Sequence, residues 1–242
     1  MQELKILNKD FIFVSGTIGA GKSTIISGLV KKFPNHETKV VKEYIDYKKD
    51  GEECLDCFLD GTMVPFEFQK YIVDCFFEQI MDSTADLFIC ERHPIESLLF
   101  ASQKVSLEEM EKLFDYIYNL CFKLSIPMPT ECEFVNIENS DDREQTVNEI
   151  VKRKTHSKAI LVHLNVNEST QIKHLIKRNR SSDQKYLMER GMEYLRKINL
   201  HYEALPTFRY DIKPETFYVF YRYDSGAPIP LVAVTRRRPN KY

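Results

Sequence analysis

The sequence lacks an excess of charge of either sign. Its 242 residues hold 34 Lys plus Arg and 36 Asp plus Glu, which gives a formal net charge of −2 with neutral His. Proteins that capture nucleic acid by bulk electrostatics are usually strongly basic. We therefore expect no nucleic acid among the partners of this chain.

Long apolar runs are also missing. Apolar runs such as those at residues 11–14 and 159–162 are far shorter than the ~20 residues that cross a bilayer. The first residues lack the charged, apolar and small-residue sections of a signal peptide. Apolar residues make up 43% and charged residues 29%, as in ordinary folded domains. These absences predict a cytoplasmic protein with no membrane partner.

The six cysteines lack the pattern of a zinc site. Cys54 and Cys57 form one Cys-x-x-Cys pair, but no second Cys or His pair follows at zinc-finger spacing. Several other cysteines lie in apolar segments, as small hydrophobic residues do in a reducing compartment. We interpret the pair as structural or incidental.

Strands and helices are predicted to alternate along the chain. Apolar runs predict strands, and apolar residues at helical spacing predict helices. The strands are expected at 11–15, 38–43, 87–90 and 159–166, and the helices at 22–33, 65–83, 106–124, 167–179 and 184–205. This order is typical of an α/β fold, a parallel sheet flanked by helices on both faces, with ligands at the carboxyl ends of the strands.

Two segments depart from the alternation. Residues 127–158 hold two prolines, an acidic cluster and a basic cluster, and we interpret them as an exposed excursion. Residues 215–236 are expected to form a C-terminal strand pair around a turn. The chain shows no internal repeat, so a single domain over residues 1–242 is predicted.

One motif matches a phosphate-binding loop in full. It follows a predicted strand, opens a predicted helix, and reads Gly16-Thr17-Ile18-Gly19-Ala20-Gly21-Lys22-Ser23, with Thr24 next. The backbone N–H groups of such a loop surround phosphate oxygens, Lys22 reaches the outer phosphates, and the Ser23 hydroxyl can bind Mg²⁺. The loop predicts ATP or GTP binding. It does not say which chemistry follows, because kinases, switches and motors share it.

Charged residues close two further predicted strands. Glu43 ends the second strand, where a carboxylate can accept a proton from a hydroxyl, although a plain surface glutamate is equally compatible with this position. Glu91 and Arg92 end the third strand. Glu91 can hold Mg²⁺ and Arg92 can bind the attacking oxygen or the transferring phosphoryl group.

A cluster of cations occupies residues 173–180. It contains Arg178 and Arg180 at the end of a predicted helix. Cations at that position complement the helix dipole, but they can also belong to a lid that places arginines on the triphosphate.

These motifs together resemble the deoxynucleoside kinase family. The phosphate loop, Glu43, Phe68-Gln69, Glu91-Arg92-His93-Pro94-Ile95 and residues 177–180 occur in the family's order over residues 11–205. The Glu-Arg-His-Pro-Ile motif and the Arg-x-Arg pair are most similar to herpesvirus-type thymidine kinases, while residues 66–69 also resemble the cellular enzymes. The resemblance implies a P-loop kinase fold with an arginine-bearing lid. It also implies ATP and Mg²⁺ as cofactors, a deoxynucleoside such as thymidine as substrate, and a possible homodimer.

The resemblance also implies a role for each site residue. Glu43 is the base for the 5′-hydroxyl, Arg92 binds that hydroxyl, Glu91 lies near Mg²⁺, Gln69 pairs with the nucleobase, Phe100 stacks on it, and Asp183 contacts the sugar 3′-hydroxyl. Lys22, Arg178 and Arg180 serve the phosphates. The chain departs from the family at Tyr44, where proline is usual, and at His174, where arginine is expected.

Two other functions remain open from the sequence. A thymidylate kinase shares the loop, the acid-arginine pair and the lid, but a base such as Glu43 would repel the incoming phosphate of a monophosphate substrate. A nucleotide-gated binding module also fits the loop, although the sequence lacks an Asn-Lys-x-Asp guanine-binding motif.

Overall fold

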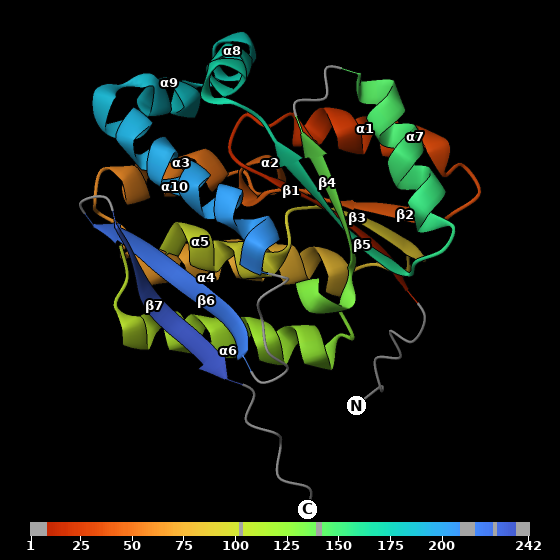
Figure 1. Cartoon of the computed structure of the whole chain (residues 1–242), viewed down its shortest axis with the longest axis horizontal. Helices are drawn as coiled ribbons and strands as arrows, with labels where there is room; N and C mark the ends of the chain where they lie inside the picture. Colours follow the sequence, from red (N-terminus) through yellow and green to blue (C-terminus); the bar gives the residue numbers. More distant parts are fainter. Residues whose placement is uncertain (1–8, 102–103, 139–141, 209–215, 225–226, 236–242) are drawn as a thin grey trace, which may run out of the picture.

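The core of the protein is a five-stranded parallel sheet (Figure 1). The computed structural model describes residues 9–101, 104–138, 142–208, 216–224 and 227–235. The strands lie in the order β2-β3-β1-β5-β4 and span Asp10–Gly16 (β1), Thr38–Val41 (β2), Leu87–Glu91 (β3), Glu133–Glu138 (β4) and Ala159–Asn165 (β5). Every pair in this sheet is parallel, which confirms the predicted fold class.

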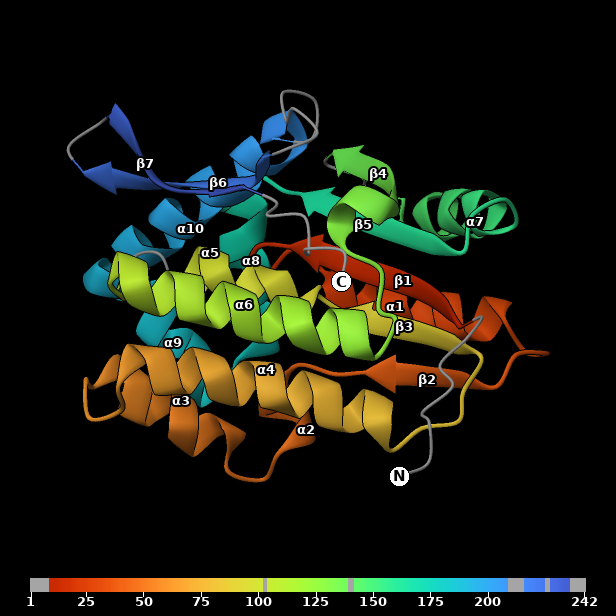
Figure 2. The ribbon, with the colours of Figure 1, turned by 90° about the horizontal axis from the view of Figure 1, so that it is seen from below.

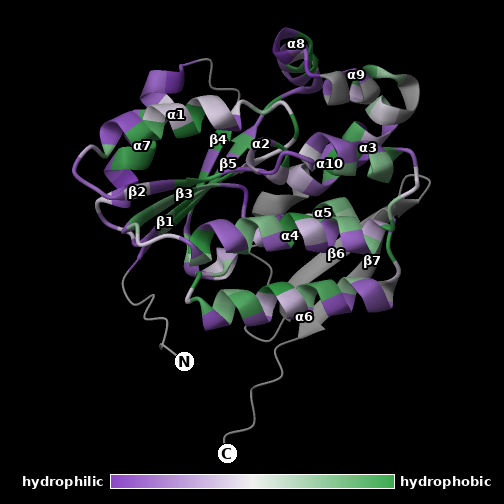
Figure 3. Ribbon diagram, turned by 180° about the vertical axis from the view of Figure 1, so that it is seen from behind, coloured by the Kyte–Doolittle hydropathy of each residue, from purple (hydrophilic) through white to green (hydrophobic). Residues whose placement is uncertain are grey.

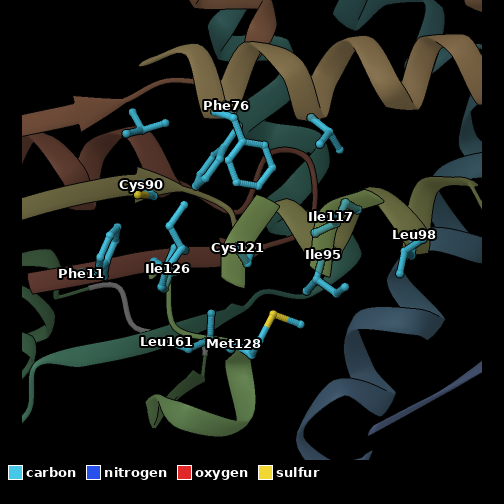
Figure 4. Close-up of a cluster of buried hydrophobic side chains, with 14 of the residues drawn as sticks. Phe11, Phe76, Cys90, Ile95, Leu98, Ile117, Cys121, Ile126, Met128 and Leu161 are labelled. Carbon is cyan, nitrogen blue, oxygen red and sulfur yellow. The ribbon is translucent and has the colours of Figure 1, made fainter. Parts of the chain in front are cut away.

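Successive residues of the buried strands point to opposite faces of the sheet. Phe11 and Phe13 of β1 belong to the apolar core on one face, and Ile12 and Val14 belong to the core on the other. Figure 4 shows Phe11 in the first of these cores. Because both faces need cover, the central strands are apolar almost throughout.

Helices cover both faces (Figure 2). One face carries α1 (Lys22–Lys32) and α7 (Arg143–Lys154). The other carries α4 (Pro65–Met81), α5 (Ser97–Ala101), α6 (Leu107–Lys123) and α10 (Glu189–Phe208). Hydrophobic and hydrophilic residues alternate along α4 and α6 in Figure 3, as expected of helices that turn one side to a core. The capping box of Ser106 and Glu109 opens α6 as predicted.

The interpretation of residues 127–158 as an exposed excursion is wrong. After the short 3₁₀ helix η2 (Pro129–Glu131) the segment forms β4, which pairs with β5 along the edge of the sheet, and then α7, which lies beside α1. Val147 of α7 packs closely on Gly28 of α1: a Cβ at position 28 would lie only 2.7 Å from Cγ2 of Val147. The sequence pattern did not predict these two elements, because β4 is an edge strand with alternating polar residues and α7 has a narrow apolar side.

The remaining elements lie mostly around the carboxyl edge of the sheet. They are α2 (Tyr44–Tyr47), α3 (Gly51–Leu59), η1 (Pro94–Glu96), α8 (Glu168–Arg178) and α9 (Ser181–Leu187). The predicted helix over 184–205 is divided at Met188 into α9 and α10. The predicted C-terminal strand pair corresponds to the antiparallel β6 (Thr216–Asp224) and β7 (Ala227–Thr235), beside α6 and α10. None of the described helices is long and apolar enough to cross a membrane.

A buried histidine fixes the turn after β3. The Ile95 N–H donates to Nδ1 of His93 at 3.1 Å, and Nε2 lies 3.1 Å from the Pro127 carbonyl oxygen. Because a backbone N–H can only donate and a carbonyl can only accept, these partners require the neutral tautomer with its proton on Nε2. Burial lowers the pKa of His93 to about 3.

This neutral histidine predicts that acid destabilises the fold. An unfolded histidine binds a proton as the pH falls below about 6.5, whereas folded His93 stays neutral down to about 3, so stability is lost as the pH falls through this window. At pH 5 the loss from this group is about 2 kcal/mol relative to pH 7. Urea unfolding at both pH values should show that His93→Asn, which keeps an acceptor for the Ile95 N–H, loses less stability than the wild type. Equal losses would contradict the assignment.

Candidate active site

The phosphate loop lies between β1 and α1, where Gly16, Gly19 and Gly21 have backbone conformations that other residues rarely adopt. Gly16 has φ +140°, and a Cβ there would lie 2.7 Å from the Leu164 carbonyl oxygen. Gly21 has φ +91° and is the N-cap of α1. The N-terminus of α1 therefore opens directly onto the loop, which provides the N–H groups and the positive dipole end that bind phosphate.

Lysine, serine and two carboxylates meet beside the loop. The Lys22 Nζ donates to the Thr17 carbonyl at 3.2 Å and lies 3.8 Å from Oε1 of both Glu43 and Glu91. The Ser23 hydroxyl donates to Oε1 of Glu91 at 3.4 Å. Glu43 is the N-cap of α2, two residues after β2 ends, so it lies beyond the strand rather than at its end as predicted. The carboxyl ends of three strands thus bring together groups far apart in sequence.

Arg92 is the centre of this arrangement. Its Nε donates to Oε1 of Glu43 at 2.5 Å, and its Nη1 donates to the Gly16 carbonyl. Its backbone has φ +71°, an uncommon conformation for a residue with a side chain and one that is frequent at functional sites. The Phe100 ring covers the guanidinium, with 4.9 Å from Cζ to the ring centroid. The Glu43–Arg92 pair thus joins two groups that the sequence predicts for the site.

The two carboxylates have opposite electrostatic environments. Burial alone raises the pKa of Glu43, but the charges of Arg92 and Lys22 outweigh it and hold that pKa well below its usual range. Burial and the nearby charge of Glu43 raise the pKa of Glu91. Burial and the charge of Arg92 lower the pKa of Lys22. Glu43 is thus a stable anion at neutral pH. The ionised form of Glu91 is stabilised when a cation lies beside it.

The oxygen ligands at this edge suit Mg²⁺. A hydroxyl and a carboxylate, Ser23 and Glu91, are the hard ligands that Mg²⁺ takes together with nucleotide phosphates. Among the described residues no group of three or more His, Cys, Asp or Glu side chains could hold a metal alone. This donor set fits a cation that arrives with a nucleotide.

A cavity extends from these charged groups between α2, α3, α4 and α5. Gln69 of α4 lines it with a side chain that is only 1% exposed, and its amide oxygen has no hydrogen-bond partner among the described residues. The aromatic residues that line the cavity are Tyr44, Phe58, Phe68, Phe76, Phe100, Tyr186 and Tyr194. A buried amide oxygen without a partner, among aromatic rings, is suited to a flat ligand that has a hydrogen-bond donor.

Arg178 and Arg180 also face this cavity. Arg178 ends α8 and makes a two-bond ion pair with Asp183, whose side chain is buried. Arg180 precedes α9 and pairs with Asp46 of α2 at 2.9 Å. Asp183, predicted to contact the sugar, lies in the cavity wall and holds Arg178.

A second cavity lies on the other side of the phosphate loop. Gly21 and Ile25, Arg143 and Thr146 of α7, and His174 of α8 are among the residues that line it. The Nδ1 of His174 is 2.7 Å from the Gly19 carbonyl oxygen, so this residue contacts the loop backbone where the family resemblance predicts an arginine. Arg143 and Thr146 of α7 therefore lie beside the phosphate loop.

Three residues that hold the arginines of the site could not be found from motifs. Glu96 and Tyr202 contact Arg92, and Asp46 binds Arg180. The i, i+4 spacing of Arg92 and Glu96 indicates that the two side chains can pair. Tyr202 is 110 residues from Arg92, and only the packing of α10 brings it there.

The fold and site define a P-loop protein of the phosphotransferase class. A model of the deoxynucleoside kinase family matches residues 12–128. The chain is 26% identical over 220 residues to a deoxyguanosine kinase of Lactobacillus acidophilus, covering 88% of this chain and 82% of that protein. A structure of deoxyadenosine kinase from M. mycoides with bound dCTP matches with a TM-score of 0.53 and 22% identity, covering 84% of this chain and 86% of that one; at that identity it supports the fold.

Over residues 12–128 the chain is similar to the deoxynucleoside kinase family, whose members are ATP-dependent phosphotransferases. The family match includes the phosphate loop, Glu43, Gln69 and Arg92, and the motif order continues to Arg178 and Arg180 around the end of α8. A particular similarity to herpesvirus-type thymidine kinases stays a prediction.

Proposed function

We propose that this protein transfers the γ-phosphoryl group of ATP to the 5′-hydroxyl of a deoxynucleoside, with Mg²⁺ bound by Ser23 and Glu91. The observation that supports this most is the Glu43–Arg92 pair. It lies between the phosphate loop and the aromatic cavity, where an acceptor hydroxyl and a donor phosphate must meet.

Each group has a defined task in the transfer. The acceptor oxygen bonds to the γ-phosphorus while the bond from that phosphorus to the β–γ bridging oxygen breaks, and the hydroxyl proton passes to Glu43. A weak base is sufficient because the transition state of phosphoryl transfer is loose and the proton leaves late. Lys22, Arg178 and Arg180 neutralise the charge that builds up on the phosphates, and Mg²⁺ supplies further charge when bound.

We assign the two substrates to the two cavities. The deoxynucleoside occupies the aromatic cavity, with its base against Gln69 and Phe100 and its sugar near Asp183. The loop residues 16–24 hold the ATP phosphates, and the cavity beside α7 is open to the donor's base. A side-chain amide can present a donor and an acceptor together, which suits the edge of any of the four bases.

The finer choice of base is therefore decided by the cavity walls. Thymidine is our first expected acceptor. The names of the relatives add deoxyguanosine and deoxyadenosine to the acceptors to be tested.

ADP release with ATP and Mg²⁺ should be measured against thymidine, deoxycytidine, deoxyadenosine, deoxyguanosine and thymidine monophosphate, with a reaction lacking acceptor as the blank. Turnover of one or more nucleosides supports the proposal, turnover of the monophosphate alone indicates a thymidylate kinase, and no turnover despite bound ATP indicates a binding module.

Gln69→Ala should weaken the nucleoside selectively. Loss of the buried amide removes the hydrogen bonds to the base, so the nucleoside Michaelis constant should rise about tenfold while that for ATP changes less than about twofold. Steady-state kinetics with each substrate varied in turn would measure both constants. Gln145→Ala, on the exposed side of α7, is the control. Equal effects on both substrates would remove Gln69 from the base site.

A further inference from the structure

The buried hydroxyl of Tyr202 contacts Arg92 and has no role in the proposed mechanism. The Tyr202 hydroxyl of α10 donates to Oε2 of Glu96 at 2.5 Å and accepts a hydrogen bond from Nη1 of Arg92. Both Tyr202 and Glu96 are 3% exposed. The other oxygen of Glu96 accepts the backbone N–H of His93 at 2.8 Å. The carboxylate is therefore fixed by the turn that follows Arg92.

The direction of these hydrogen bonds follows from the groups themselves. A guanidinium has no acceptor, so Arg92 must donate to the tyrosine oxygen, and the phenol proton is then available only for Glu96. Burial raises the pKa of Tyr202 well above its usual range, which keeps the phenol protonated. Its ring stacks at 5.8 Å on the buried ring of His163. The hydroxyl is thus held from both sides.

These contacts leave one edge of Arg92 for a substrate. Nε is taken by Glu43 and Nη1 by Gly16, Tyr202 and, at 3.4 Å, Glu96. Among the described residues Nη2 makes no hydrogen bond. The guanidinium is planar, so fixing Nε and Nη1 also fixes the direction of the two Nη2 protons.

We propose that Tyr202, together with Glu96, is a positioning residue that holds the Arg92 guanidinium so that Nη2 is directed at the acceptor oxygen and the transferring phosphoryl group. This inference rests on the proposed function. It assigns a reaction role to α10 through Arg92, without contact between Tyr202 and the substrate.

Tyr202→Phe is the central test because it keeps the ring and removes only the hydroxyl. Arg92 acts on charge that develops in the transition state, while the base contacts hold the nucleoside, so kcat should fall about tenfold and the nucleoside KM should change less than about twofold. Tyr116→Phe is the matched control. Its hydroxyl also donates to a carboxylate, that of partly buried Asp74, between α6 and α4. Its kinetics should equal those of the wild type at a similar Tm.

A double-mutant cycle separates positioning from general destabilisation. Lysine lacks the planar fork, so in an Arg92→Lys background the Tyr202→Phe change should cost less than about twofold in kcat. An undiminished tenfold cost in that background would overturn the proposal. So would wild-type kinetics for Tyr202→Phe, or a loss of kcat that comes with an equal rise in KM and a lowered Tm.

A measurement without turnover tests the same contact. In protein labelled with ¹⁵N-arginine, the Arg92 Nε–H resonance, identified by its loss in Arg92→Lys, should exchange slowly with solvent in the wild type and in Tyr116→Phe. In Tyr202→Phe it should exchange about tenfold faster. If the wild type phosphorylates no nucleoside, the proposed function fails while this result still decides the positioning: unchanged exchange would contradict it.

Discussion

Glu43→Gln should reduce turnover by about 10²-fold or more while nucleoside binding stays within about threefold of the wild type. Glutamine keeps the shape of the side chain and an oxygen for the Arg92 Nε–H, which the carboxylate accepts at 2.5 Å. It cannot take the hydroxyl proton, and it removes the negative charge that balances Arg92 and Lys22. Saturating initial rates and nucleoside affinity by calorimetry would separate the two effects.

The control for this variant is another glutamate paired with an arginine. Glu149 of α7 accepts hydrogen bonds from Arg153 on the surface, so Glu149→Gln removes the same kind of charge away from the site and should leave turnover unchanged. A rate for Glu43→Gln within about threefold of the wild type would exclude Glu43 as the proton acceptor.

Replacing Arg178 and Arg180 together with alanine should reduce turnover by about 10²-fold and raise the ATP Michaelis constant. Both arginines face the cavity beside the phosphate loop, and each is held by an acid, Asp183 or Asp46, rather than by solvent alone. When a triphosphate is present, these cations can exchange an acid partner for phosphate oxygens. Rates measured over a range of ATP concentrations would give both constants.

Two variants guard this test against a folding defect. Loss of Arg178 leaves the buried carboxylate of Asp183 without its cation, which is destabilising. Tm must therefore be measured together with the kinetics. Arg178→Lys should recover part of the lost Tm. Arg196→Ala, which breaks an exposed ion pair with Glu168 on α8, should keep normal kinetics. Normal kinetics in the double alanine variant would assign both arginines to the helix end alone.

The sequence predicts the site better than it predicts the rim of the fold. In a parallel sheet the residues after each strand meet at one edge, so the order of strands and motifs is enough to place the phosphate loop, Glu43 and Glu91-Arg92 together. The central strands are buried on both faces and therefore stand out as apolar runs. β4 and α7 face the core on one side only, and their polar residues concealed them.

The supporting contacts of Arg92 show where such reasoning ends. Glu96 lies one turn beyond Arg92 and could be suspected from spacing, but the hydroxyl of Tyr202 arrives from α10 through tertiary packing. The same holds for Asp46 and Arg180, which are 134 residues apart. Local patterns predict the groups that carry the chemistry, whereas long-range packing decides which groups orient them.

Direct transfer of label tests the central claim most sharply. The protein is incubated with [γ-³²P]ATP, Mg²⁺ and one deoxynucleoside, with its 5′-deoxy analogue as the matched control, and the products are separated by chromatography. We predict label in the nucleoside 5′-monophosphate and none in the analogue, because the proposed transfer phosphorylates only the 5′-hydroxyl. Label that appears only as inorganic phosphate, or in a diphosphate made from an added monophosphate, would contradict the account.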